Sequence, residues 1–149
     1  MNKRFNLQSL QDLSSLRLDQ ATRQLGQLIA GEKQDEARLQ LLVQYRQEYQ
    51  ALFLEAAGKG LAPGSWRNYQ TFLAKLDEAV EQARTMANSA KQRTAVGQKN
   101  WLDKRGKLKA YDTLAQRFRA RVAYEESRHE QKQADEHAAR FLDRSTKEE

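Results

Sequence analysis

The sequence predicts an all-α protein, a long two-helix antiparallel coiled coil (a hairpin) with an overhanging C-terminal helix. Three observations predict this fold class. Only 39% of the 149 residues are hydrophobic and 31% are charged, which is too polar for an ordinary compact globule. Apolar residues nevertheless recur every seven positions in both halves of the chain. Between these halves, three glycines and the single proline of the chain fall within residues 58–64.

The first helix is predicted over residues 5–57. With Leu18 at heptad position a, nine of the twelve a and d positions up to Ala56 are apolar. The polar exceptions are Glu32, Asp35 and Arg46. A regular heptad over this length indicates a coiled-coil seam and not a disordered chain.

The loop is predicted over residues 58–65. Gly58 can adopt the left-handed conformation that closes a helix, and Pro63 is excluded from a helix interior. Ser65 is a good N-cap for the helix that follows.

The second helix is predicted over residues 66–142. Its a series begins at Trp66 and ends at Val122, and its d series begins at Tyr69. A short loop makes the two helices antiparallel neighbours, so residue i should face residue 122 − i.

This pairing brings large residues opposite small ones, with Trp101 facing Ala21 and Gly97 facing Leu25. The polar seam residues near 30–36 face alanines near 86–90, so we expect the loosest packing around 30–36 and 86–97. Residues beyond about 120 have no partner helix. We therefore predict one domain over residues 1–142, with an exposed single helix at its end, and a disordered tail over 143–149.

Composition argues against several classes of protein. The chain has no cysteine, which excludes disulfides and thiolate metal sites. The basic N-terminus is not followed by an apolar run, and no apolar run is long enough to insert directly into a membrane. These features predict a soluble cytoplasmic protein.

Large side chains near the loop exceed what one seam requires. Tyr45 and Phe72 flank the seam, and the pairing rule sets Tyr45 near Leu76 and Tyr49 near Phe72. The rings either shield the seam where the hairpin turns or form a protein-binding surface, since aromatic clusters supply interface hot spots. The predicted patch comprises Leu42, Tyr45, Tyr49, Phe72, Leu76 and Ala79.

The net charge of +6 lies entirely in residues 84–149, and Lys91–Arg121 alone carries +8. This basic segment is either a solvated face or an electrostatic match to an acidic ring or pore. Nucleic acid is the third alternative, but no helix-turn-helix, zinc or RNP-like motif supports it, and no nucleic-acid partner is predicted. The candidate contact residues are Lys99, Lys104, Arg105, Lys107, Lys109, Arg117, Arg119 and Arg121.

No feature points to catalysis, so we predict that the chain is not an enzyme and has no catalytic, cofactor or metal residues. His129 and His137 lie in a polar helix that offers no closed pocket. There is no GxxxxGK[ST] phosphate loop, so any link to ATP requires a partner.

Three stretches resemble one known family. LQLLVQYRQEYQ (39–50), the Gly-x-Gly at 58–60 and WRNYQTFLAKLDEAVEQ (66–82) are similar to the FliJ family of the bacterial flagellar type III export apparatus. LQSLQDL (7–13) and DQATRQLG (19–26) match as well. The resemblance covers most of the chain and is strongest from 38 to 83.

The resemblance implies a stalk-like coiled coil similar to the central stalk of rotary ATPases. It implies contacts with the hexameric export ATPase FliI, its regulator FliH, the export gate protein FlhA and export chaperones. It further implies a role in ATPase ring assembly and in coupling the ATPase to export, hence in motility and chemotaxis. The implied location is cytoplasmic and peripheral, at the flagellar basal body beside the inner membrane.

The resemblance also implies that the gate protein binds the face that carries the aromatic patch. The implied face extends to Arg38 and Ala83 at its ends. The alternatives are a generic coiled-coil secretion chaperone or spacer, and a basic nucleic-acid-binding helix.

Overall fold

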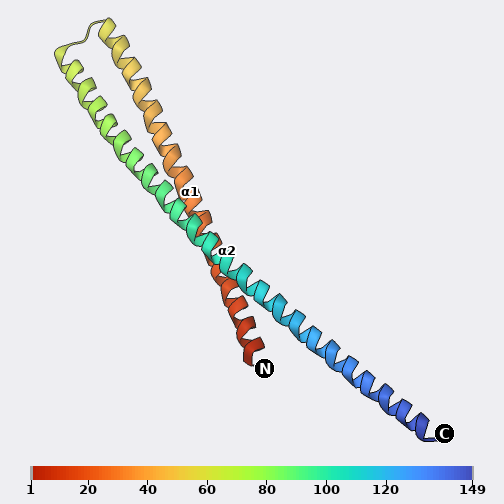
Figure 1. The fold of residues 1–149 in the computed structure, drawn as a ribbon. Helices are drawn as coiled ribbons and strands as arrows, with labels where there is room; N and C mark the ends of the chain where they lie inside the picture. The colour runs from red at the N-terminus through yellow and green to blue at the C-terminus, as the bar shows by residue number, and fades with distance from the viewer. Residues whose placement is uncertain (1, 149) are drawn as a thin grey trace. The chain divides into compact units, whose positions relative to one another are not determined.

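The computed structural model describes residues 2–148, with side chains from Asn6 onward. Two helices account for nearly all of this range: α1 (Asn2–Gly58) and α2 (Pro63–Glu148). They run antiparallel on either side of a short loop, and no strand occurs between residues 2 and 148 (Figure 1). The predicted all-α hairpin is confirmed.

The loop is shorter than predicted. It comprises residues 59–62, not 58–65. Gly58 is the last residue of α1, and the left-handed residue is Gly60, whose φ is 89°. The amide of Lys59 donates to the Ala56 carbonyl at 3.2 Å and so tightens the last turn of α1.

Helix α2 starts earlier than predicted because Pro63 is its first residue. The N–H that proline lacks would have no intrahelical partner at this position, and the fixed φ of proline suits the start of a helix. The Trp66 amide donates to the Ala62 carbonyl at 3.0 Å. The acceptor of this first helical hydrogen bond therefore lies about one turn before the predicted start at residue 66. Ser65 lies inside the helix and is not its N-cap.

The tail also differs from the prediction of disorder over 143–149, because α2 continues through Glu148. Lys147 Nζ lies 3.5 Å from Asp143 Oδ2, one turn earlier. Ion pairs at this spacing stabilise a helix by about 0.3–0.5 kcal/mol.

The chain, treated as one domain in the sequence analysis, divides into two compact units. The hairpin unit comprises Arg17–Lys104 and includes the loop. The terminal unit comprises Met1–Leu16 and Arg105–Glu149.

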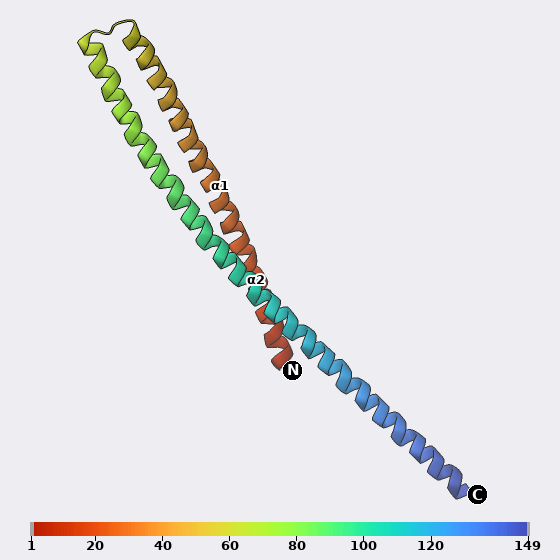
Figure 2. The same ribbon diagram turned by 45° about the horizontal axis from the view of Figure 1, so that its top comes forward.

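In the hairpin unit, the two segments lie side by side in both views (Figure 1, Figure 2). Every buried residue here occupies a predicted a or d position, which confirms the seam. Val43 packs at the edge of the seam against a core cluster formed by Leu39, Val80, Ala83 and Ala87. The buried residues are Ala21, Leu39, Leu76, Val80, Ala83, Ala87 and Ala90.

The predicted pairing is confirmed by bonds across the seam. Trp101 Nε1 donates to Thr22 Oγ1 at 2.9 Å, next to the predicted partner Ala21. Thr94 Oγ1 donates to the Leu28 carbonyl at 3.3 Å, which is where the rule places it. The predicted looseness of the middle stays a prediction, although the best-buried alanine, Ala87, lies within it.

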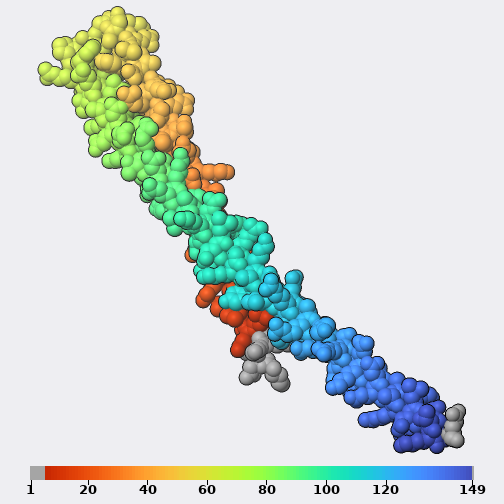
Figure 3. Space-filling model, in the orientation of Figure 1, coloured from red at the N-terminus to blue at the C-terminus, as the bar shows by residue number. Residues whose placement is uncertain are grey.

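In the terminal unit, the start of α1 packs on α2 through Ala115 and Ser14, both buried. Gln11 Nε2 donates to Asp112 Oδ1 at 3.0 Å. From residue 123 to 148 every side chain is exposed, as expected of a helix without a partner (Figure 3, blue).

Candidate functional site: the aromatic end of the hairpin

Six rings near the loop form a continuous set of contacts across the two helices, here called the aromatic ladder. Tyr49 lies 4.4 Å from Phe72 and 5.4 Å from Tyr69, measured between ring centroids. Phe53 lies 5.4 Å from Tyr69. Its members are Tyr45, Tyr49, Phe53, Trp66, Tyr69 and Phe72.

The two ends of the ladder are edge-to-face contacts. Tyr45 meets Phe72 at 6.4 Å with an interplanar angle of 84°, and Phe53 meets Trp66 at 5.0 Å with an angle of 61°. Such pairs contribute about 0.5–1.5 kcal/mol beyond the burial of their area. The rings therefore hold the hairpin together where it turns, as one of the two open interpretations expects.

The ladder is nevertheless not sealed from solvent. None of its six members is buried, and Tyr45 and Trp66 are 47% and 42% exposed. The seam has room for only two residues in each heptad of a helix, and Tyr45 and Phe72 stand beside it. The same rings thus stabilise the hairpin and present a surface.

The structure narrows the predicted patch. Leu76 and Ala83 are buried, at 7% and 5% exposure, because both occupy seam d positions. Leu42, Tyr49, Phe72 and Ala79 are half-buried, whereas Tyr45 and Arg38 are exposed. The exposed patch is therefore Tyr45 with the outer edges of its half-buried neighbours, and not a uniform six-residue stripe.

Sequence reasoning did not include two exposed leucines beside this patch. Leu41 and Leu52 are 67% and 57% exposed. They precede Tyr45 by four residues and follow it by seven, so all three project from one side of α1. Reading the flanking heptad positions as well as the seam would have identified them.

The rings perturb one phenol. Partial burial in the ladder raises the pKa of Tyr49 above its ordinary value of 10.0, and the neighbouring Tyr69 and Tyr45 add to the shift. Tyr49 therefore remains neutral throughout the physiological range.

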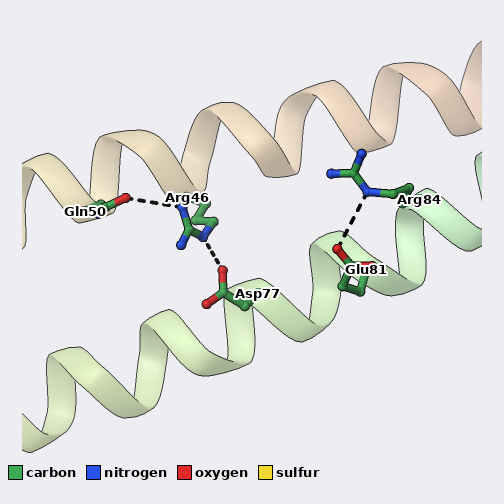
Figure 4. Close-up of polar contacts among 5 residues, drawn as sticks. All are labelled: Arg46, Gln50, Asp77, Glu81 and Arg84. Atoms are coloured by element: carbon green, nitrogen blue, oxygen red, sulfur yellow. Dashed lines mark hydrogen bonds and ion pairs between the residues drawn. The ribbon is translucent and has the colours of Figure 1, made fainter.

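The other flank of this part of the hairpin is polar. Arg46, a polar residue at a seam position, forms an ion pair with Asp77 across the helices, and its Nη1 donates to Gln50 Oε1 at 3.2 Å (Figure 4). Arg84 Nε lies 3.7 Å from Glu81 Oε1 on α2. Arg46 is half-buried at the seam edge, so its charge is only partly removed from water.

The basic candidates fall in both units. In the hairpin unit Lys99 is exposed, and Lys104 is half-buried with its Nζ 3.9 Å from Asp103 Oδ2. In the terminal unit all remaining candidates are exposed. Those residues are Arg105, Lys107, Lys109, Arg117, Arg119 and Arg121.

The two histidines, His129 and His137, are exposed on the unpartnered part of α2. In the part of the chain that the structure describes, no group of three or more histidine or acidic side chains could hold a metal ion. None of the described helices is both long and apolar enough to cross a membrane.

These features define a class of protein: a helical hairpin that offers surfaces along two paired helices. Within this class, residues 2–147 match the family model described as the flagellar FliJ protein. The chain therefore belongs to the FliJ family of flagellar proteins.

Two relatives carry the same description. A flagellar FliJ protein of Salmonella typhi is 36% identical over 134 residues, which cover 90% of this chain and 91% of the relative. A flagellar FliJ protein of Escherichia coli (strain K12) is 32% identical over 134 residues, with the same coverage of both chains. The predicted family is confirmed.

Proposed function

We propose that this chain is a non-enzymatic, stalk-like component of the flagellar type III export apparatus, located at the cytoplasmic side of the basal body. Membership of the FliJ family supports a flagellar role. The observation that carries the finer proposal is the aromatic ladder, whose rings lock the hairpin while Tyr45 remains 47% exposed. A surface of this kind serves binding and not catalysis.

The proposed partner at this end is the export gate protein FlhA. The binding surface would be Tyr45, the outer edge of Phe72, and the neighbouring Leu41 and Leu52, which are exposed. A few aromatic and aliphatic side chains at the centre of an interface supply most of its binding energy. Leu76 and Ala83 would act by supporting this surface from the seam.

The proposed partner for the basic segment is the hexameric ATPase FliI, with its regulator FliH and export chaperones as further partners. An excess of exposed lysine and arginine steers association with an acidic surface, more strongly at low salt. The exposed candidates, such as Lys109, Arg117 and Arg121, support this assignment. Promotion of ATPase ring assembly is the proposed consequence.

Binding to the purified cytoplasmic domain of FlhA tests the first assignment. In the double variant Tyr45→Ala with Phe72→Ala, binding should weaken by about tenfold or more while helicity by circular dichroism is kept. Leu54→Ala removes a side chain that is 62% exposed but lies on another side of α1, and it serves as the matched control. Unchanged binding in the double variant would leave the ladder with a structural role only, as in a simple spacer.

Purified FliI tests the second assignment. Addition of the chain should promote FliI oligomerisation and raise its turnover, and the effect should weaken as salt rises. If oligomerisation and turnover do not change, the stalk assignment fails.

A further inference from the structure

A groove lies on the hairpin unit, beyond the aromatic ladder along the two helices. Gln24 and Leu28 of α1 and the stretch of α2 from Ser89 to Asn100 line a volume of about 540 Å³. Neither the gate-binding surface nor the basic candidates proposed above include any of the residues that line it.

The floor of the groove is apolar because of a glycine in the seam. Gly97 occupies a d position, and a Cβ there would come within 2.5 Å of Leu28 Cδ1. Leu28 therefore packs directly on the backbone of α2. At the other seam positions of α2, a side chain occupies the corresponding space. Val96, which is 68% exposed, forms the apolar edge.

The rim of the groove is polar and carries positive charge only. Gln24 and Gln92 supply amides, and Arg93 is the one charged side chain among the residues that line the groove. Arg93 also lies within the segment Lys91–Arg121, which carries +8. The groove thus combines an aliphatic floor with a cationic rim.

We propose that this groove binds an acidic amphipathic helix of a partner protein. The twelve residues from Ser89 to Asn100 rise about 18 Å, or about three turns. That length fits a helix that presents apolar side chains at i, i+3 or i+4, and i+7. Its aliphatic side chains would pack on Leu28 and Val96, and a carboxylate beside them would pair with Arg93.

Charge also argues against a second copy of this chain as the occupant. A symmetric pairing of two such grooves would set Arg93 against Arg93, with no acidic side chain among the lining residues to separate them. The proposal does not depend on the gate assignment, since the two surfaces use different residues.

The probe is a synthetic helix of about 18 residues, with leucines at the four positions i, i+3, i+4 and i+7 and glutamates at the flanking positions. A twin peptide carries lysines in place of the glutamates. Fluorescence anisotropy with the full chain should show binding of the glutamate peptide and at least about tenfold weaker binding of the lysine twin. Absence of binding up to about 1 mM, or equal binding of the two peptides, would overturn the proposal.

Charge-matched variants of the full chain then locate the site. Val96→Glu and Arg93→Glu should each weaken binding of the glutamate peptide by about tenfold. Leu102→Glu and Lys91→Glu place the same new charge on exposed positions of α2 that do not line the groove, and should change the affinity by less than about twofold. Circular dichroism checks that helicity is kept in all four variants.

Three outcomes would contradict this location. The first is equal weakening in the groove variants and their controls. The second is loss of binding in Tyr45→Ala while Val96→Glu still binds, which would move the peptide to the aromatic ladder. The third is self-association of the chain, measured by sedimentation, that Val96→Glu abolishes. This result would make a second copy of the chain the occupant of the groove.

Discussion

At the loop end of the hairpin unit, six rings pack on one another and none is buried, whereas further along the same helices Ala83, Ala87 and Ala90 are almost inaccessible. Each ring can remove far more apolar surface from water than an alanine methyl can, even when it is only half covered. The aromatic end therefore owes its stability to contact area. The alanine-rich middle depends instead on close approach of the two helices, because each small side chain supplies little contact area.

The first prediction breaks the fit of the middle. Ala87→Asp places a carboxylate at a position that is 2% exposed, and should lower the free energy of unfolding by about 3 kcal/mol or more. Ala95→Asp makes the same change at an exposed position of α2 and should cost less than about 1 kcal/mol. Urea unfolding of the two variants measures the difference, and equal costs would show that the middle is not close-packed.

The second prediction removes contact area from the aromatic end. Tyr49→Ala deletes a ring that touches two others, and should lower the free energy of unfolding by about 2 kcal/mol. This value is at the low end for truncations of large core side chains, because the site is half-open to solvent. Tyr45→Ala, at a 47% exposed ring, should cost less than about 1 kcal/mol. Urea unfolding again measures both. A larger cost for Tyr45 than for Tyr49 would reverse the roles assigned here to seam and surface.

The third prediction compares two glycines. Gly26→Ala meets no atom within 4 Å and should stabilise the chain by about 1 kcal/mol through helix propensity. In Gly97→Ala the new methyl would force Leu28 to move, so this gain should be cancelled or reversed. Thermal unfolding distinguishes them, and a similar gain at both positions would mean that Leu28 yields without cost.

The smallest expected effect is a pH dependence of the aromatic end. Because the pKa of Tyr49 is raised in the folded chain by partial burial, the neutral phenol is favoured on folding. The associated stability is complete below the ordinary tyrosine pKa of 10.0 and declines as the pH rises through the higher folded value. Tyr49→Phe should remove this part of the decline in urea titrations, and an unchanged decline in this variant would contradict the assignment.

The heptad pattern was sufficient to predict the seam and the pairing of the helices, because both follow from which residues must avoid water. It placed Thr94 beside Leu28 and Tyr49 beside Phe72 with only a small offset. The ends of the helices were harder to predict. Glycine permits several backbone conformations, and Gly60 is left-handed where Gly58 was proposed for this role.

The surface was only partly predictable. A heptad position shows which side of a helix a residue occupies, but not how much of its side chain the opposite helix covers. Leu76, which the pairing rule placed on the patch, and Ala83, which the resemblance placed at its edge, are both buried at their d positions. The heptad pattern placed Gly97 in the seam opposite Leu25, but it did not predict that Leu28 would pack on this glycine or that a groove would form there.

The four-residue loop has a consequence for the order in which the chain folds. Phe53 and Trp66 are 13 positions apart in the sequence, whereas Gln11 and Asp112 are 101 positions apart. The entropy lost on closing a chain segment grows with its length, so the contacts beside the loop are the least costly to form first. We therefore expect folding to start at the rings and to propagate along the two helices away from the turn. Each pair of residues that forms a contact shortens the chain segment that the next pair must close.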